Sequence, residues 1–141
     1  MAPIPLASTV RKAIDEAEAS REEDSIPIRV YGVDELDPSI RIFCIEDLFI
    51  DCIGHLFENI RKRKTSDDAD LWISAACDNQ SIYLRWANNK TKPGRVPEGQ
   101  HGLQLLRRRL GSFGATLEIE TRGLEPRLTF AVTTSFVVIK E

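Results

Sequence analysis

The stretch IFCIEDLFIDCIGHLFENIRKRK, residues 42–64, decides the fold. Its apolar side chains recur mostly at intervals of three and four residues, which places them on one face of an α-helix. They are Ile42, Ile45, Phe49, Cys52, Ile53, Leu56 and Ile60. The stretch ends in four cations, residues 61–64, where the helix dipole favours positive charge. With the helix-start signal DPS at residues 37–39, the pattern predicts a helix of about five turns from Ile42 onward.

Upstream of this helix the sequence predicts another helix and a strand. Within residues 6–24, Leu6, Val10, Ile14 and Ala17 recur near helical spacing. Acidic residues gather near the end of this segment, so we expect the helix to fray by about Ala19. The alternating segment IPIRVYGV, residues 26–33, follows as a strand.

Downstream, the sequence predicts two hairpins, a loop and a third helix. The segments LWISAAC (71–77) and SIYLRWA (81–87) alternate as hairpin strands around a three-residue turn. The segment NNKTKPGRVPEGQ (88–100) has almost no apolar residue and predicts a flexible loop. Helical spacing returns in LQLLRRRLGSF (103–113), and TLEIE (116–120) and RLTFAVTTSF (127–136) read as strands joined by a turn.

This order of elements predicts an α+β fold. Helices and hairpins alternate without a βαβ repeat, which favours a two-layer α/β sandwich over a doubly wound sheet. The length of 141 residues and 15.9 kDa corresponds to one domain, residues 1–141. We expect it to contain an N-terminal helical segment, residues 1–25, and a lid-like loop, residues 88–101.

Composition excludes several classes of protein. An apolar fraction of 42% and a charged fraction of 29% are typical of a globular domain. The net charge of −3 argues against a protein that binds nucleic acid over its whole surface. The basic residues 61–64 are a local exception, but no aromatic side chain interleaves them as a base-stacking platform would require.

Location and metal chemistry follow from similar observations. No stretch approaches the ~20 apolar residues that a membrane span needs, and the N-terminus does not resemble a secretory signal, so we expect a cytoplasmic domain. Cys44, Cys52 and Cys77 form no Cys-x-x-Cys pair, and the first two are expected to be buried, reduced thiols. Two histidines, His55 and His101, are too few for a histidine-rich metal site.

Three segments together resemble a known family. They are HLFENIRKR (55–63), WANNKTK (86–92) and QHGLQLLRRRL (100–110) followed by FGATL (113–117). In this order they resemble the ATP-binding catalytic domain of sensor histidine kinases, part of the GHKL ATPase superfamily with the Bergerat fold, over about residues 26–136. The resemblance implies a mixed sheet covered on one face by helices. It is clearest for the nitrate-sensor type, whose long helix carries Glu-x-x-x-Asn-x-x-Lys-His.

The resemblance implies roles for Asn59 and Lys62 on the long helix. Asn59 stands where the family's asparagine coordinates the magnesium ion that bridges the nucleotide phosphates, and Mg²⁺ prefers such hard oxygen ligands. Lys62 lies one turn later on the same face and is placed to meet a phosphate as a point charge. The alternatives are a surface asparagine near a helix end and a solvated lysine.

The second motif departs from the family's Asp-x-Gly-x-Gly. Asn88 stands where the family's aspartate accepts a hydrogen bond from the adenine amino group, and Lys90 and Lys92 replace the two glycines. An asparagine keeps an acceptor oxygen but loses the charge, a change that costs roughly 1–2 kcal/mol. The lysines add bulk where the backbone approaches the ligand, although their charges also favour a triphosphate. Weak or absent ATP binding is therefore an open alternative.

The third motif is better kept. It resembles the family's His-Gly-Leu-x-x-Met-Arg-Glu-Arg-Val, and it places His101 and Gly102 at the start of a helix whose free N–H groups favour a phosphate. The alternative is that Gly102 only lets the loop turn into the helix. The three arginines 107–109 cannot all face one way on a helix.

His55 replaces the glutamate that activates water in related ATPases. A histidine has a pKa suited to a general base, but a partly buried, hydrogen-bonded histidine is the favoured reading.

Two functions follow from the resemblance. The first is an ATP- and Mg-binding domain of two-component signalling that positions Mg–ATP for phosphoryl transfer to a histidine on a separate domain. Its partners would be a dimerisation and phosphoacceptor helical domain or a response regulator. The second is a degenerate, non-catalytic module that acts by docking or regulation. A hydrolytic ATPase is the weakest reading because the glutamate base is missing.

Overall fold

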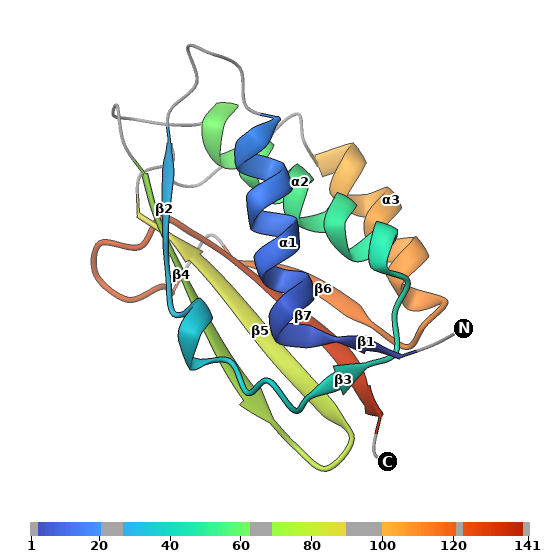
Figure 1. Cartoon of the computed structure of the whole chain (residues 1–141). Coiled ribbons are helices and arrows are strands. Elements are labelled where there is room, and N and C mark those ends of the chain that lie inside the picture. Colours follow the sequence, from blue (N-terminus) through green and yellow to red (C-terminus); the bar gives the residue numbers. More distant parts are fainter. Residues whose placement is uncertain (1–2, 21–26, 63–68, 90–99, 121–122, 140–141) are drawn as a thin grey trace.

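The structure is a computed structural model that describes residues 3–20, 27–62, 69–89, 100–120 and 123–139, without the side chains of residues 100–103 (Figure 1). Its elements follow in this order: β1 (Ile4–Pro5), α1 (Leu6–Ala19), β2 (Ile28–Tyr31), the 3-10 turn η1 (Val33–Glu35), β3 (Arg41–Ile42), α2 (Glu46–Lys62), β4 (Ala69–Cys77), β5 (Ser81–Asn88), α3 (Gln100–Gly111), β6 (Thr116–Glu120) and β7 (Phe130–Ile139).

The molecule has two layers. Within the described residues, seven strands form one sheet in the order β1-β3-β7-β5-β4-β2, and β6 also pairs with β7. The β2–β4 pair is parallel, and the other described pairs are antiparallel. The three helices lie on one face of this sheet (Figure 1). The predicted two-layer α+β sandwich, with a mixed sheet covered on one face, is confirmed.

The strand β7 joins the parts of the sheet. It pairs with β5 over residues 130–137, with β6 over residues 131–135 and with β3 over residues 138–139. Its side chains are buried along most of its length. Three strands that lie far apart in the sequence, β3, β5 and β6, therefore pair with this one strand.

The core lies between the sheet and the helices. On β5, Ile82, Leu84 and Trp86 are buried, whereas the alternate residues Tyr83 and Arg85 are exposed or half-buried. This alternation directs the buried set toward the helices. Trp86 is fully buried and its Nε1 donates to Thr134 Oγ1 at 3.4 Å, so the indole N–H is satisfied.

The three helices are tied to one another by side chains. Arg61 of α2 donates to the carbonyl oxygen of Ala17 and pairs with Glu18, both near the C-terminal end of α1. Arg109, near the end of α3, lies 3.8 Å from Asp51, in the first half of α2. The helices α2 and α3 are therefore antiparallel, and the C-terminal end of α2 lies toward the N-terminal end of α3 (Figure 1).

The predicted start of the long helix is wrong. Ile42 belongs to β3, where it pairs with Val138, and α2 begins only at Glu46. The DPS signal forms a turn instead, in which the Asp37 carboxylate accepts hydrogen bonds from the backbone N–H and the hydroxyl of Ser39. An apolar residue at position 42 is compatible with a helix and with a strand, because Ile42 is fully buried in β3 as it would be on the inner face of a helix.

Other boundaries also shift. β2 ends at Tyr31, because Gly32 turns the backbone with a φ of 98°, and Ile26 lies outside the described residues. β5 includes Asn88 and α3 begins at Gln100, so the connection is shorter than the predicted loop 88–101, and its residues 90–99 lie outside the description. α3 ends at Gly111 rather than Phe113, and β7 runs to Ile139. The short strands β1 and β3 were not predicted.

The cysteine prediction holds for the two residues it concerned. Cys44 and Cys52 are buried, and burial raises their pKa values to about 11 and about 12. Their thiols therefore stay protonated and unreactive near neutral pH. Cys77 is exposed. None of the helices in the described ranges is long and apolar enough to cross a membrane.

Candidate functional site

Two asparagines are buried between the helices and the sheet, one on each layer. Asn59 lies on the buried side of α2 between Leu56 and Ile60 and is 9% exposed. Asn88, the last residue of β5, continues the helix-facing alternation of that strand and is 0% exposed. Burying an amide is costly unless a partner compensates for the lost water, so each position needs an explanation.

No contact among the described residues explains why the Asn59 amide is buried. Among the residues that the structure describes, none forms a hydrogen bond with its amide, although the residue is nine-tenths buried. No buried side-chain nitrogen or oxygen among those residues lacks a partner, so the Asn59 amide atoms keep some access to solvent. An amide in this state has hydrogen-bonding capacity that the described residues leave unused.

Asn88, in contrast, is used by the fold. Its Nδ2 donates to the backbone carbonyl of Asp70 in β4 at 2.9 Å, and its own carbonyl accepts from the backbone N–H of Thr129 at 2.9 Å. The neighbouring Asn89 exchanges two hydrogen bonds with Asp70, whose carboxylate also accepts from Arg29 of β2. The end of β5 is thus held by a polar network.

The ends of three elements gather at one end of the molecule. The C-terminal end of α2, the N-terminal end of α3 and the end of β5 all lie at the end opposite the β4–β5 turn (Figure 1). His101 and Gly102 fall in the first turn of α3, inside the helix rather than before it. Lys62 is exposed at the end of α2, where it pairs with Glu58 at 3.0 Å. Lys90 and Lys92 lie outside the described residues.

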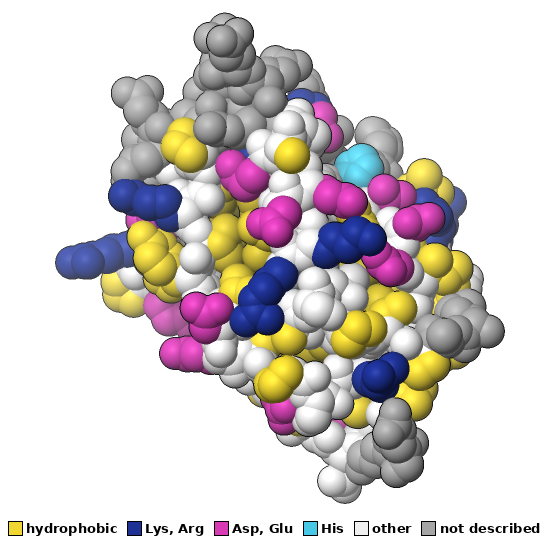
Figure 2. All heavy atoms as spheres, in the orientation of Figure 1, with side chains coloured by type: hydrophobic (Ala, Val, Ile, Leu, Met, Phe, Trp, Pro, Cys, Tyr) yellow, Lys and Arg dark blue, Asp and Glu magenta, His cyan; other side chains and the backbone are white. Residues whose placement is uncertain are grey.

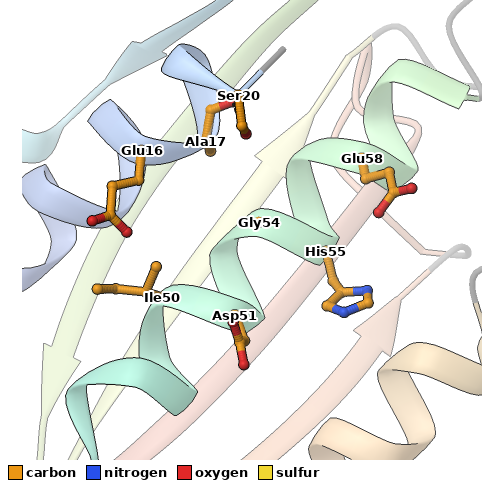
Figure 3. Close-up of a pocket in the computed structure, with 8 residues that line it drawn as sticks. All are labelled: Glu16, Ala17, Ser20, Ile50, Asp51, Gly54, His55 and Glu58. Carbon is orange, nitrogen blue, oxygen red and sulfur yellow. Dashed lines mark hydrogen bonds between the residues drawn. The ribbon is translucent and has the colours of Figure 1, made fainter. Parts of the chain in front are cut away.

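His55 is exposed rather than partly buried, which corrects the reading favoured from the sequence. It lines a pocket of about 390 Å³ that belongs to α1, α2 and the residue after α1, with no strand residue in its lining (Figure 3). The other lining residues are Glu16, Ala17, Ser20, Ile50, Asp51, Gly54 and Glu58. Figure 3 shows Glu16 and Ile50 between the two helices and His55 on the side of α2 that is turned away from α1.

Charges on the helical face are mixed. Figure 2 shows carboxylates and cations interspersed around the imidazole, without a large patch of one sign. The arginines of α3 diverge as predicted: Arg107 Nε donates to the carbonyl of Leu117 at 2.8 Å, Arg109 faces Asp51, and Arg108 is exposed. The described residues hold no group of three or more His, Cys, Asp or Glu side chains that suits a metal ion.

Sequence reasoning missed Arg29, Asp70 and Asn89. Asp70 and Arg29 lie opposite each other in the parallel β2–β4 register, and Asn89 lies beside Asp70 because Asn88 pairs with Leu71. The sequence offered one indication, an aspartate at the start of a strand whose other residues are mostly apolar or small. The contacts of Asp70 depend on how β4 pairs with β2 and β5, and local sequence does not reveal that pairing.

Two solved structures of other proteins resemble the structure of this chain along almost its whole length. A scan against protein-family models finds no match, and a search of curated proteins finds none either. The structure of the mycobacterial sensor histidine kinase MprB matches 99% of this chain over its own full length, with a TM-score of 0.69 and 9% identity. The structure of full-length ShkA in complex with AMPPNP matches 99% of this chain with a TM-score of 0.68 and 17% identity. This chain corresponds to 32% of ShkA. From end to end, the chain therefore has the fold of a histidine kinase ATP-binding domain.

Proposed function

We propose that the domain binds Mg–ATP and positions it for phosphoryl transfer to a histidine on a separate domain, as part of two-component signalling. The observation that carries this proposal is Asn59, a nine-tenths buried amide that no described residue of the fold uses. The resemblance places a magnesium ligand at the same position of the same helix. A fold that needed no ligand there would gain stability from an apolar side chain.

The residues fit the nucleotide unevenly. The Asn59 oxygen suits Mg²⁺, which takes few ligands from protein and the rest from phosphates and water. The first turn of α3, with Gly102, has the free N–H groups that suit an anion. Lys62 would have to leave Glu58, an exposed ion pair of little energetic value, to reach a phosphate. When bound, Mg²⁺ would neutralise phosphate charge, and the chain's own residues would position the nucleotide.

The acceptor histidine is proposed to lie outside these residues. His55 faces a pocket made by helical residues, and the described residues contain no dimerising helical hairpin. The proposed partners are therefore a dimerisation and phosphoacceptor domain or a response regulator. The cytoplasm is the proposed compartment, in agreement with the two buried, reduced thiols.

A melting experiment with Mg–ADP tests the proposal. A ligand at a hundredfold excess over its Kd stabilises a protein by about 2.7 kcal/mol, so we expect the Tm to rise by several degrees. Asn59→Ala should abolish most of this rise without lowering the Tm of the free protein, because the fold makes no described use of the amide. Asn79→Ala, an exposed asparagine at the β4–β5 turn, is the matched control and should keep the full rise.

A second candidate function is a docking or regulatory module without nucleotide. It is favoured by Asn88, whose amide nitrogen serves the fold and which lacks the carboxylate that the resemblance implies for adenine. No rise in Tm at millimolar Mg–ADP, with or without Asn59, would reject nucleotide binding and leave this second function.

A further inference from the structure

Arg61 of α2 caps the C-terminal end of α1. Its Nη1 donates to the carbonyl oxygen of Ala17 at 3.2 Å, and its Nη2 pairs with the Glu18 carboxylate at 2.8 Å. The last carbonyls of a helix have no partner within the helix, and they favour a positive charge beside them. The last turn of α1 has no basic residue of its own, so α2 supplies this charge from outside.

The same side chain also packs on its own helix. The Arg61 guanidinium lies over the ring of Phe57, one turn earlier in α2, at 5.7 Å from the ring centroid. The Arg61 side chain is only 14% exposed, whereas ion pairs that contribute little are those exposed to water. Arg61 therefore joins the last turns of α1 and α2 by a largely buried contact.

Arg61 and Asn59 lie at opposite edges of the buried side of α2. Each residue turns an α-helix by about 100°, so these two side chains point about 160° apart. The apolar residues that point between them, Leu56, Phe57 and Ile60, are at most 3% exposed. Apolar burial is not directional and still allows a helix to roll about its axis, whereas hydrogen bonds are directional. A polar contact at one edge therefore fixes the orientation of the other edge.

We propose that Arg61 is a positioning residue for the metal end of the nucleotide site: by joining the last turn of α2 to α1, it holds Asn59 in the orientation that a nucleotide-bound Mg²⁺ requires. This inference rests on the proposed function, in which Asn59 is the magnesium ligand. Arg61 points toward α1 and acts only through the helix. Because Mg²⁺ demands near-ideal octahedral geometry, metal binding depends on this orientation more than nucleotide binding without metal does.

The Mg²⁺ dependence of ADP binding is the readout that this role predicts. Isothermal titration gives the Kd of ADP in Mg²⁺ and in EDTA, and we call the ratio of the two values the Mg²⁺ factor. Residues that orient a metal ligand typically change metal affinity by about 10- to 100-fold when they are replaced. We expect a Mg²⁺ factor of at least about ten in the wild type and about three or less in Arg61→Ala, with unchanged binding in EDTA.

Two variants on α1 test whether the effect passes through the contact between the helices. Glu18→Gln keeps Arg61 but removes the charge with which it pairs, so we expect an intermediate Mg²⁺ factor. Lys12→Ala is the matched control, because it breaks another ion pair between α1 and α2, the pair of Lys12 with Glu46. Glu46 is the first residue of α2, far along the helix from Asn59, so this variant should keep the wild-type factor.

Hydrogen exchange in the free protein gives a second measurement that needs no nucleotide. Without the full contact to α1, the last turn of α2 should open more often, because helix ends fray. We therefore expect the backbone amides of residues 59–62 to exchange faster in Glu18→Gln than in the wild type, with no change in β5 and β7. If Arg61→Ala does not fold, Glu18→Gln provides both measurements.

The outcomes separate this inference from the proposed function. A Mg²⁺ factor that does not fall in Arg61→Ala or Glu18→Gln, or that falls as far in Lys12→Ala, would overturn the inference and leave nucleotide binding intact. Wild-type binding of ADP that is equally strong with and without Mg²⁺ would overturn it as well. Binding of ADP under neither condition would overturn both the inference and the proposed function.

Discussion

At the scale of single residues, Asn88 shows why a motif position needs its neighbours to be understood. From the sequence, it is an uncharged asparagine at the position where the resemblance to histidine kinases implies an aspartate. In the structure, its nitrogen donates to a backbone carbonyl in a fully buried place, which an ionised aspartate cannot do. Placing an aspartate at position 88 would therefore remove a hydrogen bond that the fold uses.

Asn88→Asp is expected to lower the free energy of unfolding by about 1–3 kcal/mol at pH 7.5, because a carboxylate would face the carbonyl of Asp70. This setting favours the protonated acid, so the pKa in the folded state should lie above the value of about 3.9 in the unfolded chain. The loss should be complete above the folded pKa and should shrink as the pH falls toward 4.

Urea unfolding at pH 7.5 and pH 4.5, each compared with the wild type at the same pH, measures this effect. Gln104→Glu, an exposed position on α3, adds a carboxylate without burying it and should cost little at either pH. An equal loss at both pH values would mean that the introduced carboxylate meets no opposing acceptor.

What the sequence predicted at this scale depended on local pattern. Asn59 stood out because a motif on one helix contains it, and the structure places it on the buried side of that helix. Asp70 did not stand out, because its partners Arg29 and Asn89 come from two other strands. Periodicity contains no information about which strands become neighbours.

At the scale of elements, Gly32 and Gly54 differ in whether the structure requires a glycine at their position. Gly32 ends β2 with a φ of 98°, and a Cβ there would lie 2.1 Å from the backbone oxygen of Ile73. Gly54 lies within α2, and a Cβ there would meet nothing within 4 Å. The first is required by the approach of two backbones, and the second only lowers helix propensity.

Gly32→Ala should therefore destabilise the protein by more than about 2 kcal/mol, through a strained φ and a clash with backbone that cannot rotate away. Gly54→Ala should stabilise it by about 0.5–1 kcal/mol. Urea unfolding of both variants measures the difference. A similar effect of the two substitutions would contradict the close approach of Gly32 to β4.

The start of α2 shows the limit of prediction for elements. The spacing of Ile42 and Ile45 continues the helical pattern, yet Ile42 pairs with Val138 near the other end of the chain. The helix type, its end and the β4–β5 hairpin followed from local pattern. The strands β1 and β3 did not, since two-residue strands exist only through the partners they meet.

At the scale of the whole molecule, the layer order was predictable because it follows from the order of helices and hairpins. The strand order was not, since β7 could be placed between β5 and β6 only by contacts far apart in sequence. The antiparallel α2 and α3 likewise depend on side chains such as Arg109 and Asp51.

A chain that stops at residue 129 should lose cooperative unfolding altogether, because β5, β6 and β3 would each lose the strand they share. Circular dichroism during a urea titration should show a broad, shallow change in place of a single transition. Thr133→Ala, at a half-buried position of β7, should keep a sharp transition. A cooperative transition in the shortened chain would mean that β7 is not the strand that unites the sheet.

The central place of β7 also matters while the protein is being made. During synthesis, β4, β5 and β6 leave the exit tunnel of the ribosome before β7 does. Until β7 emerges, the edges of β5 and β6 with which it will pair stay open in the nascent chain. Open strand edges attract other strands. For this protein, the interval before residue 130 emerges is the period in which protection by a chaperone has most value.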